Sequence, residues 1–200
     1  MTRHKRAADR RRDLIAAARR AMLRYGADNV QLRHVADEAG LTPGAVLYHY
    51  PDVRDLLIEA QHAGMERFWT QRVSAAESIA DPAERLRVTI RSGLPDGPDD
   101  ADVRLLCELG GASGRNRVYA ALLTSLFDRQ VAMYEVILTE GVAAGTFTLA
   151  TDARSIARNI VALEDAYGYR INARHPSIDT EVAYQLIVAY ASQATGHDLR

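Results

Sequence analysis

Apolar residues recur at every third or fourth position along nearly the whole chain, the spacing that gives a helix one apolar face. Alternating apolar and polar residues, typical of strands, form no convincing run. The pattern therefore predicts an all-α fold of about nine helices. The first is expected from Ala8 to Tyr25, and the others over about 32–39, 43–50, 52–78, 82–92, 103–109, 115–144, 152–174 and 180–195.

Glycines and aspartates mark the expected helix ends. Glycine tolerates the left-handed conformation that often ends a helix, and Gly26, Gly40 and Gly145 each follow an apolar stripe. Gly110-Gly111 is expected to end the short helix that begins at Val103. Aspartate accepts hydrogen bonds from the first turn, and the expected caps are Asp52, Asp81, Asp152 and Asp179.

The segment from Gln31 to Tyr50 has the pattern of two short helices joined by a tight turn. Leu32, Val35, Ala36 and Ala39 share one face of the first helix. Thr42 can cap the second helix, and Pro43 fits its first turn, where no backbone N–H is needed. This pattern predicts a helix-turn-helix, whose second helix enters the major groove of DNA.

The distribution of charge favours the same function. The formal net charge is −1, yet residues 1–60 hold 11 Lys/Arg against 8 Asp/Glu, and the rest holds 14 against 18. A basic arm over residues 1–12 suits contacts to DNA phosphates, whose strength falls steeply with salt. A solvated tail without a partner is the alternative. The cationic residues of the arm are Arg3, Lys5, Arg6, Arg10, Arg11 and Arg12.

The same stretch resembles the TetR family of transcriptional regulators. The matching motifs are Val35-Ala36, Gly40-Leu41-Thr42, Val46-Leu47-Tyr48-His49-Tyr50-Pro51 and Leu56-Leu57. Three positions depart from the family pattern. Gln31 stands in place of Thr or Ser, and Leu47 in place of a phosphate-binding Tyr. Val53 stands in place of a Lys, whose positive charge the neighbouring Arg54 can supply.

The resemblance implies a DNA-binding domain over residues 1–51 and a helical effector-binding and dimerisation domain over residues 52–200. It also implies a cytoplasmic homodimer that represses transcription from a palindromic operator and is released by a small molecule. A transcriptional activator, or a DNA-binding protein without an effector, is the alternative. The expected DNA contacts are Lys5, Arg6, Gln31, Arg33, Thr42, Pro43, Gly44, Ala45, Tyr48, His49 and Arg54.

Tyr48 and Tyr50, at the end of the second short helix, are expected to have different roles. Tyr48 lies three residues after Ala45, so both can meet base edges, whereas in the alternative Tyr48 packs against neighbouring helices. Tyr50 is expected to pack in this second way, and Val46 and Leu47 are expected in or near the core.

The last two helices are expected to form the dimer interface, as the resemblance implies. Their apolar stripes face a partner, their own core, or both. The expected interface residues are Ile156, Ile160, Tyr167, Val182, Leu186 and Tyr190.

The resemblance implies an effector pocket between the central helices, where aromatic residues lie beside carboxylates. Such a pocket suits a cationic or amphipathic molecule, because aromatic faces and carboxylates both attract cations. In the alternative, the carboxylates pair with Arg104, Arg129, Arg158 or Arg170 on the surface, and the aromatic residues are core. The expected lining is Phe68, Trp69, Cys107, Glu108, Phe127, Tyr134, Glu135, Leu163, Glu164 and Tyr167.

Other functions lack a motif. The histidines are scattered, and no metal-protease motif, nucleophile elbow or phosphate-binding loop occurs, so we expect no catalytic residue, cofactor or metal. Cys107 is the only cysteine, which rules out an intramolecular disulfide, and it is expected as a small buried side chain. No apolar run is long enough to span a membrane, and no signal peptide is expected.

Overall fold

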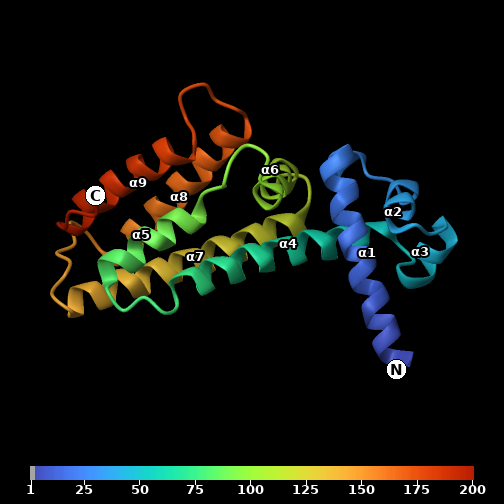
Figure 1. Cartoon of the computed structure of the whole chain (residues 1–200), viewed down its shortest axis with the longest axis horizontal. Helices are drawn as coiled ribbons and strands as arrows, with labels where there is room; N and C mark the ends of the chain where they lie inside the picture. The colour runs from blue at the N-terminus through green and yellow to red at the C-terminus, as the bar shows by residue number, and fades with distance from the viewer. Residues whose placement is uncertain (1–2) are drawn as a thin grey trace. The chain divides into compact units, whose positions relative to one another are not determined.

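The structure, a computed structural model, describes the backbone of residues 3–200 and the side chains from residue 8 onward. Within this range every regular element is helical, which confirms the predicted all-α fold. Nine α-helices and one short 3-10 helix follow one another along the chain (Figure 1). They are α1 (Arg3–Tyr25), η1 (Ala27–Asn29), α2 (Leu32–Ala39), α3 (Pro43–His49), α4 (Val53–Ala76), α5 (Pro82–Gly93), α6 (Ala101–Ser113), α7 (Arg117–Ala143), α8 (Ala153–Asn172) and α9 (Thr180–Thr195).

The predicted caps hold the helix ends. The Asp81, Asp152 and Asp179 carboxylates accept backbone N–H bonds at 2.8, 2.9 and 2.8 Å from the first turns of α5, α8 and α9. Gly40 ends α2 with a φ of 63°, and Gly145 follows α7 with a φ of 74°. Both angles lie in the left-handed region, where a side chain would be strained.

Two predictions about local structure are wrong. α6 does not end at Gly110-Gly111 but continues to Ser113, because Leu109 and Ala112 are buried on either side of the glycines. Their burial offsets the cost of about 1 kcal/mol for a glycine inside a helix. Cys107 is only half-buried.

The chain folds as two compact units. Unit 1 consists of residues 1–67 and 104–123, and unit 2 consists of residues 68–103 and 124–200. Unit 1 therefore extends beyond the predicted segment 1–51, because α4 continues without a break and Leu105 of α6 packs in the core around α1, α2 and α3.

Each unit has its own apolar core. In unit 1 the core is formed by one face of α1 with Val35, Ala36, Val46 and Leu56. In unit 2, α8 and α9 lie side by side, and α5 packs on both (Figure 1). The unit 2 core is formed by buried side chains of α5, α7, α8 and α9.

Candidate DNA interface and ligand cavities

The predicted helix-turn-helix is formed by α2, the turn at Gly40, and α3. The Thr42 hydroxyl accepts a hydrogen bond from the Ala45 N–H at 3.3 Å, so Thr42 caps α3 as predicted. Val46 is fully buried and fixes α3 to the core of unit 1. The opposite face of α3 is exposed, and a helix held in this way can present that face to another molecule.

Tyr48 is the most exposed large side chain on this face, at 80%. It does not pack against a neighbouring helix; within the helix-turn-helix its ring contacts the adjacent His49 edge to face. Thr42, Pro43 and Gly44 are also exposed, and Ala45 is half-buried beside them. Nothing lies within 4 Å of a Cβ placed on Gly44, so the backbone there is open to close approach. Leu47 was expected in or near the core, and this prediction is wrong. Its side chain is 39% exposed, because Val46 and Tyr50 occupy the inner positions.

Tyr50 anchors the end of α3, as predicted. Its ring is buried, and its hydroxyl donates to Glu59 of α4 at 2.8 Å and accepts from Arg11 of α1 at 3.2 Å. Arg11 also donates to Glu59 at 3.0 Å. Burial, reinforced by the bond to Glu59, raises the pKa of the Tyr50 phenol. We call Arg11, Tyr50 and Glu59 the head cluster.

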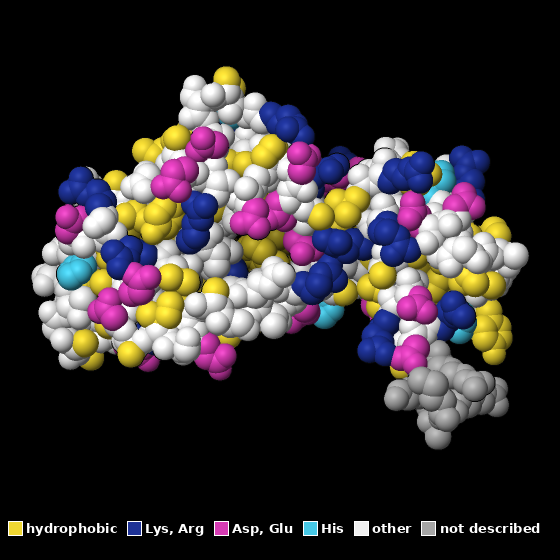
Figure 2. Space-filling view, viewed as in Figure 1, with side chains coloured by type: hydrophobic (Ala, Val, Ile, Leu, Met, Phe, Trp, Pro, Cys, Tyr) yellow, Lys and Arg dark blue, Asp and Glu magenta, His cyan; other side chains and the backbone are white. Residues whose placement is uncertain are grey.

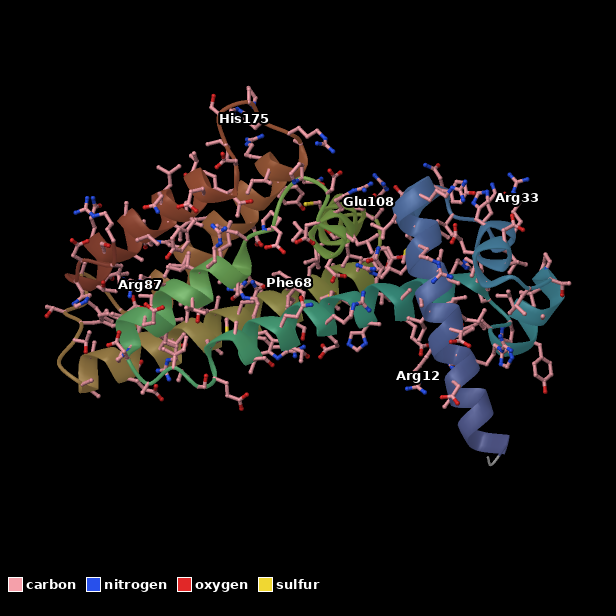
Figure 3. All side chains as sticks on the ribbon, viewed as in Figure 1. Arg12, Arg33, Phe68, Arg87, Glu108 and His175 are labelled. Atoms are coloured by element: carbon pink, nitrogen blue, oxygen red, sulfur yellow. The ribbon has the colours of Figure 1, made fainter. Side chains whose placement is uncertain are left out.

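The predicted cationic contacts of unit 1 differ in whether a carboxylate lies beside them. Arg33 projects outward from α2 at the surface and contacts His34 at 3.3 Å (Figure 3). Arg10 and Arg12 lie beside Asp13 and Asp9, and Arg54 pairs with Asp52 at 2.6 Å, which lowers the pKa of that carboxyl. The side chains of Lys5 and Arg6 lie outside the described residues. Gln31 is exposed at the start of α2, and its N–H donates to His34.

Unit 2 contains a buried ion pair that the sequence analysis missed. The Arg72 guanidinium donates two hydrogen bonds to the Glu164 carboxylate at 2.9 and 3.0 Å, and both side chains are almost completely buried. Arg72 also donates to the Tyr134 hydroxyl at 3.0 Å, and Tyr134 donates to Glu164. We call Arg72, Tyr134 and Glu164 the body cluster.

The body cluster could have been found from helical spacing. Arg72 follows Met65 and Phe68 on the buried stripe of α4, and Glu164 follows Ile160 on that of α8. Charged residues at buried positions usually require a partner of opposite charge. Burial raises the pKa of Glu164, and the charge of Arg72 opposes that shift. Burial also raises the pKa of Tyr134 well above its usual value.

Three of the residues predicted for the effector pocket, Phe68, Trp69 and Glu108, line three different cavities. Tyr134 and Glu164 are occupied in the body cluster, and Glu135 lies 3.7 Å from Arg154. These partners differ from the arginines suggested by sequence. Phe127, Leu163 and Tyr167 are half-buried against the core of unit 2. Cys107 and Glu108 belong to unit 1, where Glu108 accepts a hydrogen bond from the Ala27 N–H at 2.6 Å.

Phe68 and Trp69 line two different cavities of unit 2. Phe68 lies on α4 in the wall of the first, which has a volume of about 560 Å³ (Figure 3). We call this the acidic cavity, because three carboxylates and one guanidinium line it. Its residues are Phe68, Gln71, Ala75, Val88, Arg91, Ser92, Leu94, Asp96, Asp100 and Asp102.

Trp69 lines a second cavity, of about 440 Å³, formed by α4, α5 and α7. We call this the apolar groove. Its residues are Trp69, Val73, Ala76, Glu77, Arg85, Arg129, Ala132, Met133, Val136 and Ile137.

The predicted dimer residues separate by exposure. Ile156 and Ile160 have no exposed surface and belong to the core of their own chain, which removes them from the expected interface. Val182 and Leu186 of α9 are 39% and 44% exposed. Tyr167 and Tyr190 are half-buried. Figure 2 shows apolar side chains on the surface of this unit among charged ones.

The described part of the chain contains neither a membrane-spanning helix nor a metal-binding cluster. None of its helices is long and apolar enough to cross a membrane. The same residues contain no group of three or more His, Cys, Asp or Glu side chains placed to hold a metal ion.

Comparison with known proteins decides the nature of unit 1. Residues 14–60 match the sequence model of the bacterial regulatory proteins of the tetR family. The stretch from α1 to α4 therefore has the sequence pattern of the TetR family. The match begins at Leu14, the first buried residue among the described side chains of α1, and ends at Ala60 in α4, so it contains the whole helix-turn-helix with its anchoring Tyr50. No curated protein matches the chain.

Solved structures show that the TetR likeness in fold extends over nearly the whole chain. A transcriptional regulator from Saccharomonospora viridis in complex with choline has a TM-score of 0.86 at 23% identity, over 94% of this chain and 98% of that one. A TetR transcription regulator from Haloarcula marismortui has a TM-score of 0.85 at 22% identity, over 94% and 99%. The regulator FadR from Bacillus subtilis in complex with stearoyl-CoA has a TM-score of 0.72 at 18% identity, over 92% and 97%. The chain therefore has the fold of a TetR-family transcriptional regulator.

Proposed function

We propose that the chain is a homodimeric repressor that binds a palindromic operator and is released by a small-molecule effector. The observation that carries this proposal is the exposed outer face of α3, on which Tyr48 is 80% exposed while Val46 beneath it is fully buried. A rigidly held helix with an outward face is what major-groove recognition requires.

The proposed DNA contacts divide by chemistry. Ala45 and Tyr48 meet base edges, where the Ala45 methyl suits the methyl group of thymine and the Tyr48 hydroxyl donates one hydrogen bond. Thr42, Gly44 and the exposed Arg33 contact phosphates, which position the helix without reading sequence. Further phosphate contacts are proposed for Lys5, Arg6, Gln31, Pro43, His49 and Arg54, of which Arg54 must first release Asp52.

One α3 helix reads too few base pairs for a specific site, which is the reason for proposing a dimer. The exposed apolar side chains of α9, Val182 and Leu186, are the proposed centre of the contact between two copies. Tyr190 lies on the same helix, and its hydroxyl accepts a hydrogen bond from the Asn159 amide of α8 at 2.8 Å. Two-fold symmetry then places two α3 helices one helical turn of DNA apart, about 34–36 Å.

The proposed effector is an organic cation that binds in the acidic cavity. Asp96, Asp100 and Asp102 outnumber the one guanidinium in the lining, and that guanidinium, of Arg91, already pairs with Glu181 at 3.1 Å. Phe68 adds an aromatic side chain, which attracts cations by its ring quadrupole. The Saccharomonospora viridis regulator, which has the same fold, was solved in complex with choline, a cation of this class.

Two helices give the cavity a route to the DNA-binding domain. α4 lines the acidic cavity with Phe68 and Gln71 and begins at Val53, directly after α3. α6 lines it with Asp102, and further along the same helix Glu108 holds the N–H of Ala27, at the start of η1. A ligand that shifts either helix would alter the separation of the two DNA-binding domains in the proposed dimer. A coupling of about 1–3 kcal/mol gives a 5- to 150-fold change in DNA affinity.

The test is a selection of bound fragments from genomic DNA with the purified full-length chain, followed by footprinting. The expected result is a short palindromic site, lost when Thr42→Ala and Tyr48→Ala are combined. Choline and larger amines are then added, and one of them is expected to weaken DNA binding in the wild type but not in Asp96→Asn. If no fragment is enriched at low salt, the DNA-binding part of the proposal is wrong; if binding is specific but no amine changes it, the cationic effector is wrong.

A further inference from the structure

The start of α2 is closed by a histidine side chain. The backbone N–H of Gln31, the residue that precedes the helix, donates to Nδ1 of His34 at 3.2 Å. In the opposite direction, the His34 N–H donates to the Gln31 carbonyl at 2.9 Å. A side chain three residues after the cap that accepts from the N–H of the cap is one half of a capping box, in which this side chain is usually Glu or Gln. Here it is an imidazole, the side chain whose charge changes between pH 5 and 8.

The imidazole ring is held in one plane. It stacks on the Tyr25 ring at the end of α1, with the ring centres 4.1 Å apart and the two planes at 15° to each other. The His34 side chain is half-buried in this position. The stacked ring can keep its plane only as it stands or after a flip of 180°, and only the first orientation directs Nδ1 at Gln31.

Both nitrogens of the ring face N–H donors. Nδ1 faces the Gln31 N–H, and Nε2 lies 3.3 Å from Nε of Arg33. A neutral imidazole has one N–H and can accept at its other nitrogen, whereas a protonated imidazole donates at both. The Gln31 N–H is fixed by the backbone, while the Arg33 side chain is exposed and can turn away. The bare nitrogen of the neutral ring is therefore Nδ1, and the proton is on Nε2.

Positive groups lie close to the ring. Arg33 lies beside Nε2, and the Arg24 guanidinium lies 5.4 Å from the centre of the Tyr25 ring on which His34 stacks. The N–H groups in the first turn of a helix add a partial positive charge. A proton on Nδ1 would turn the acceptor of the Gln31 N–H into a donor and place a full positive charge beside these groups.

The carboxylates of the neighbouring elements have other partners or lie in water. Glu38, one turn further along α2, pairs with Arg20 at 3.1 Å. Asp28 of η1 pairs with Arg115 at 3.4 Å. Asp37 is exposed on α2, where water and salt screen its charge. These carboxylates therefore offset little of the charge that a proton would add to the ring.

We infer that His34 is a positioning residue for DNA binding, which fixes the start of α2 only while its ring is neutral. The inference rests on the proposed function, because Gln31 and Arg33, the two residues that the ring contacts, are proposed phosphate contacts. Protonation removes the acceptor at the start of α2 and repels Arg33. Histidine side chains ordinarily titrate at about pH 6.5, so the cap is complete above that range and is lost below it, and operator binding weakens as the pH falls.

The cap is tested first without DNA, by nitrogen–proton NMR spectra of the imidazole rings in the full-length chain. The His34 signals are assigned by their absence in His34→Gln. At pH 7.5 the ring proton is expected on Nε2, with Nδ1 bare. As the ring titrates, the Gln31 amide resonance is expected to move with the same midpoint. In His34→Gln that resonance is expected to stay in place, because a glutamine side chain accepts at every pH.

DNA binding is then measured by fluorescence anisotropy with a selected genomic fragment at pH 7.5 and pH 5.5. The readout is the ratio of the two affinities, because protonation of the other histidines affects the wild type and the variants alike. Between these pH values the wild type is expected to lose about five-fold more affinity than His34→Gln, the effect of one hydrogen bond. His34→Phe keeps a ring against Tyr25 without an acceptor, and it is expected to bind about five-fold more weakly than the wild type already at pH 7.5.

His62→Gln is the matched control. His62 lies on α4, where its Nε2 is 3.7 Å from Glu66, and it has no contact with the start of α2 among the interactions described above. The variant is expected to show the same ratio of affinities as the wild type.

Three results would overturn the inference. The first is a proton on Nδ1 of His34 at pH 7.5, and the second is a Gln31 amide resonance that does not move as the ring titrates. The third is a wild-type ratio equal to that of His34→Gln, or changed in the opposite direction because the added positive charge attracts DNA phosphates. The NMR results need no DNA, so they decide on the cap even if the chain binds no operator and the proposed function is wrong.

Discussion

The same three side chains, an arginine, a tyrosine and a glutamate, form a hydrogen-bonded cluster in each unit of the molecule. The head cluster lies near the surface, where the side chains of Arg11 and Glu59 are 52% and 40% exposed. In the body cluster the exposed fractions of Arg72 and Glu164 are 0% and 1%. The side-chain types are the same, and the main difference is burial; Arg72 also makes two bonds to its carboxylate where Arg11 makes one.

Burial makes the two clusters respond differently to damage. Water can replace a missing partner in the head cluster, and exposed ion pairs contribute only about 0.2–1 kcal/mol. In the body cluster no water can do so, and breaking a buried pair costs about 3–5 kcal/mol because the remaining charge stays buried. Loss of the head cluster is therefore expected to be tolerated, while the body cluster holds three helices of unit 2, α4, α7 and α8, in one arrangement.

The largest expected effect is that of Glu164→Ala. It leaves the Arg72 guanidinium buried and without a carboxylate, so the free energy of unfolding is expected to fall by about 3–5 kcal/mol. The matched change in the head cluster, Glu59→Ala, is expected to cost about 0.2–1 kcal/mol. Urea unfolding of both variants measures the difference, and equal losses would contradict the comparison. Replacing both charges together, as Arg72→Met with Glu164→Leu, is expected to restore most of the loss.

Gly93→Ala tests how firmly the body cluster is fixed. A Cβ at Gly93 would overlap the Glu164 carboxylate, which Arg72 and Tyr134 hold in place. The expected loss of unfolding free energy is about 1–3 kcal/mol. Gly111→Ala is the control: it lies in α6 with nothing within 4 Å of its Cβ, and it is expected to stabilise the chain by about 0.5–1 kcal/mol. A harmless Gly93→Ala would mean that Glu164 moves freely.

Removing one hydroxyl from each cluster gives the closest comparison. Tyr134→Phe leaves a fully buried guanidinium and carboxylate with one bond fewer each, and is expected to cost about 1–2 kcal/mol. Tyr50→Phe loses its bonds at a site that water can reach, and about 0.5–1 kcal/mol is expected. Thermal melting of the two variants ranks them; a larger loss for Tyr50→Phe would reverse the conclusion.

The smallest effect is expected from alkaline pH. Burial raises the pKa of both phenols above the value of about 10 in the unfolded chain. A raised pKa stabilises the folded state fully below pH 10, and this contribution is lost as the pH rises through the folded values. Arginines stay charged in this range and Lys5 is the only lysine, but burial also raises the pKa of Tyr119 and Tyr184, so the share of Tyr134 is found by comparison with its variant. Unfolding free energy measured from pH 9 to 11.5 is therefore expected to decline, and Tyr134→Phe is expected to flatten the decline.

Local patterns predicted most of the fold. The caps Thr42, Asp81, Asp152 and Asp179 follow from short-range geometry, and all four are confirmed. The helix-turn-helix is likewise a short, continuous motif. The predicted end of α6 at Gly110-Gly111 is wrong, because burial of Leu109 and Ala112 outweighs the low helix propensity of the two glycines.

The ligand cavities could not be predicted in the same way. Both are formed by residues from helices far apart in sequence, and adjacent residues such as Phe68 and Trp69 point into different cavities. Aromatic residues beside carboxylates are equally typical of a pocket and of a buried ion pair. Only the packing of α4 against α8 assigns Glu164 to Arg72 rather than to a ligand.

The central claim, that α3 reads DNA, is tested most directly by the affinity of Tyr48→Ala for a selected genomic fragment. Fluorescence anisotropy compares it with the wild type and with Val118→Ala, which removes an exposed apolar side chain elsewhere in unit 1. Tyr48→Ala is expected to bind about ten-fold or more weakly with unchanged thermal stability, and Val118→Ala to bind normally. Equal affinity for all three proteins would show that the exposed face of α3 does not contact DNA, and the account would be wrong.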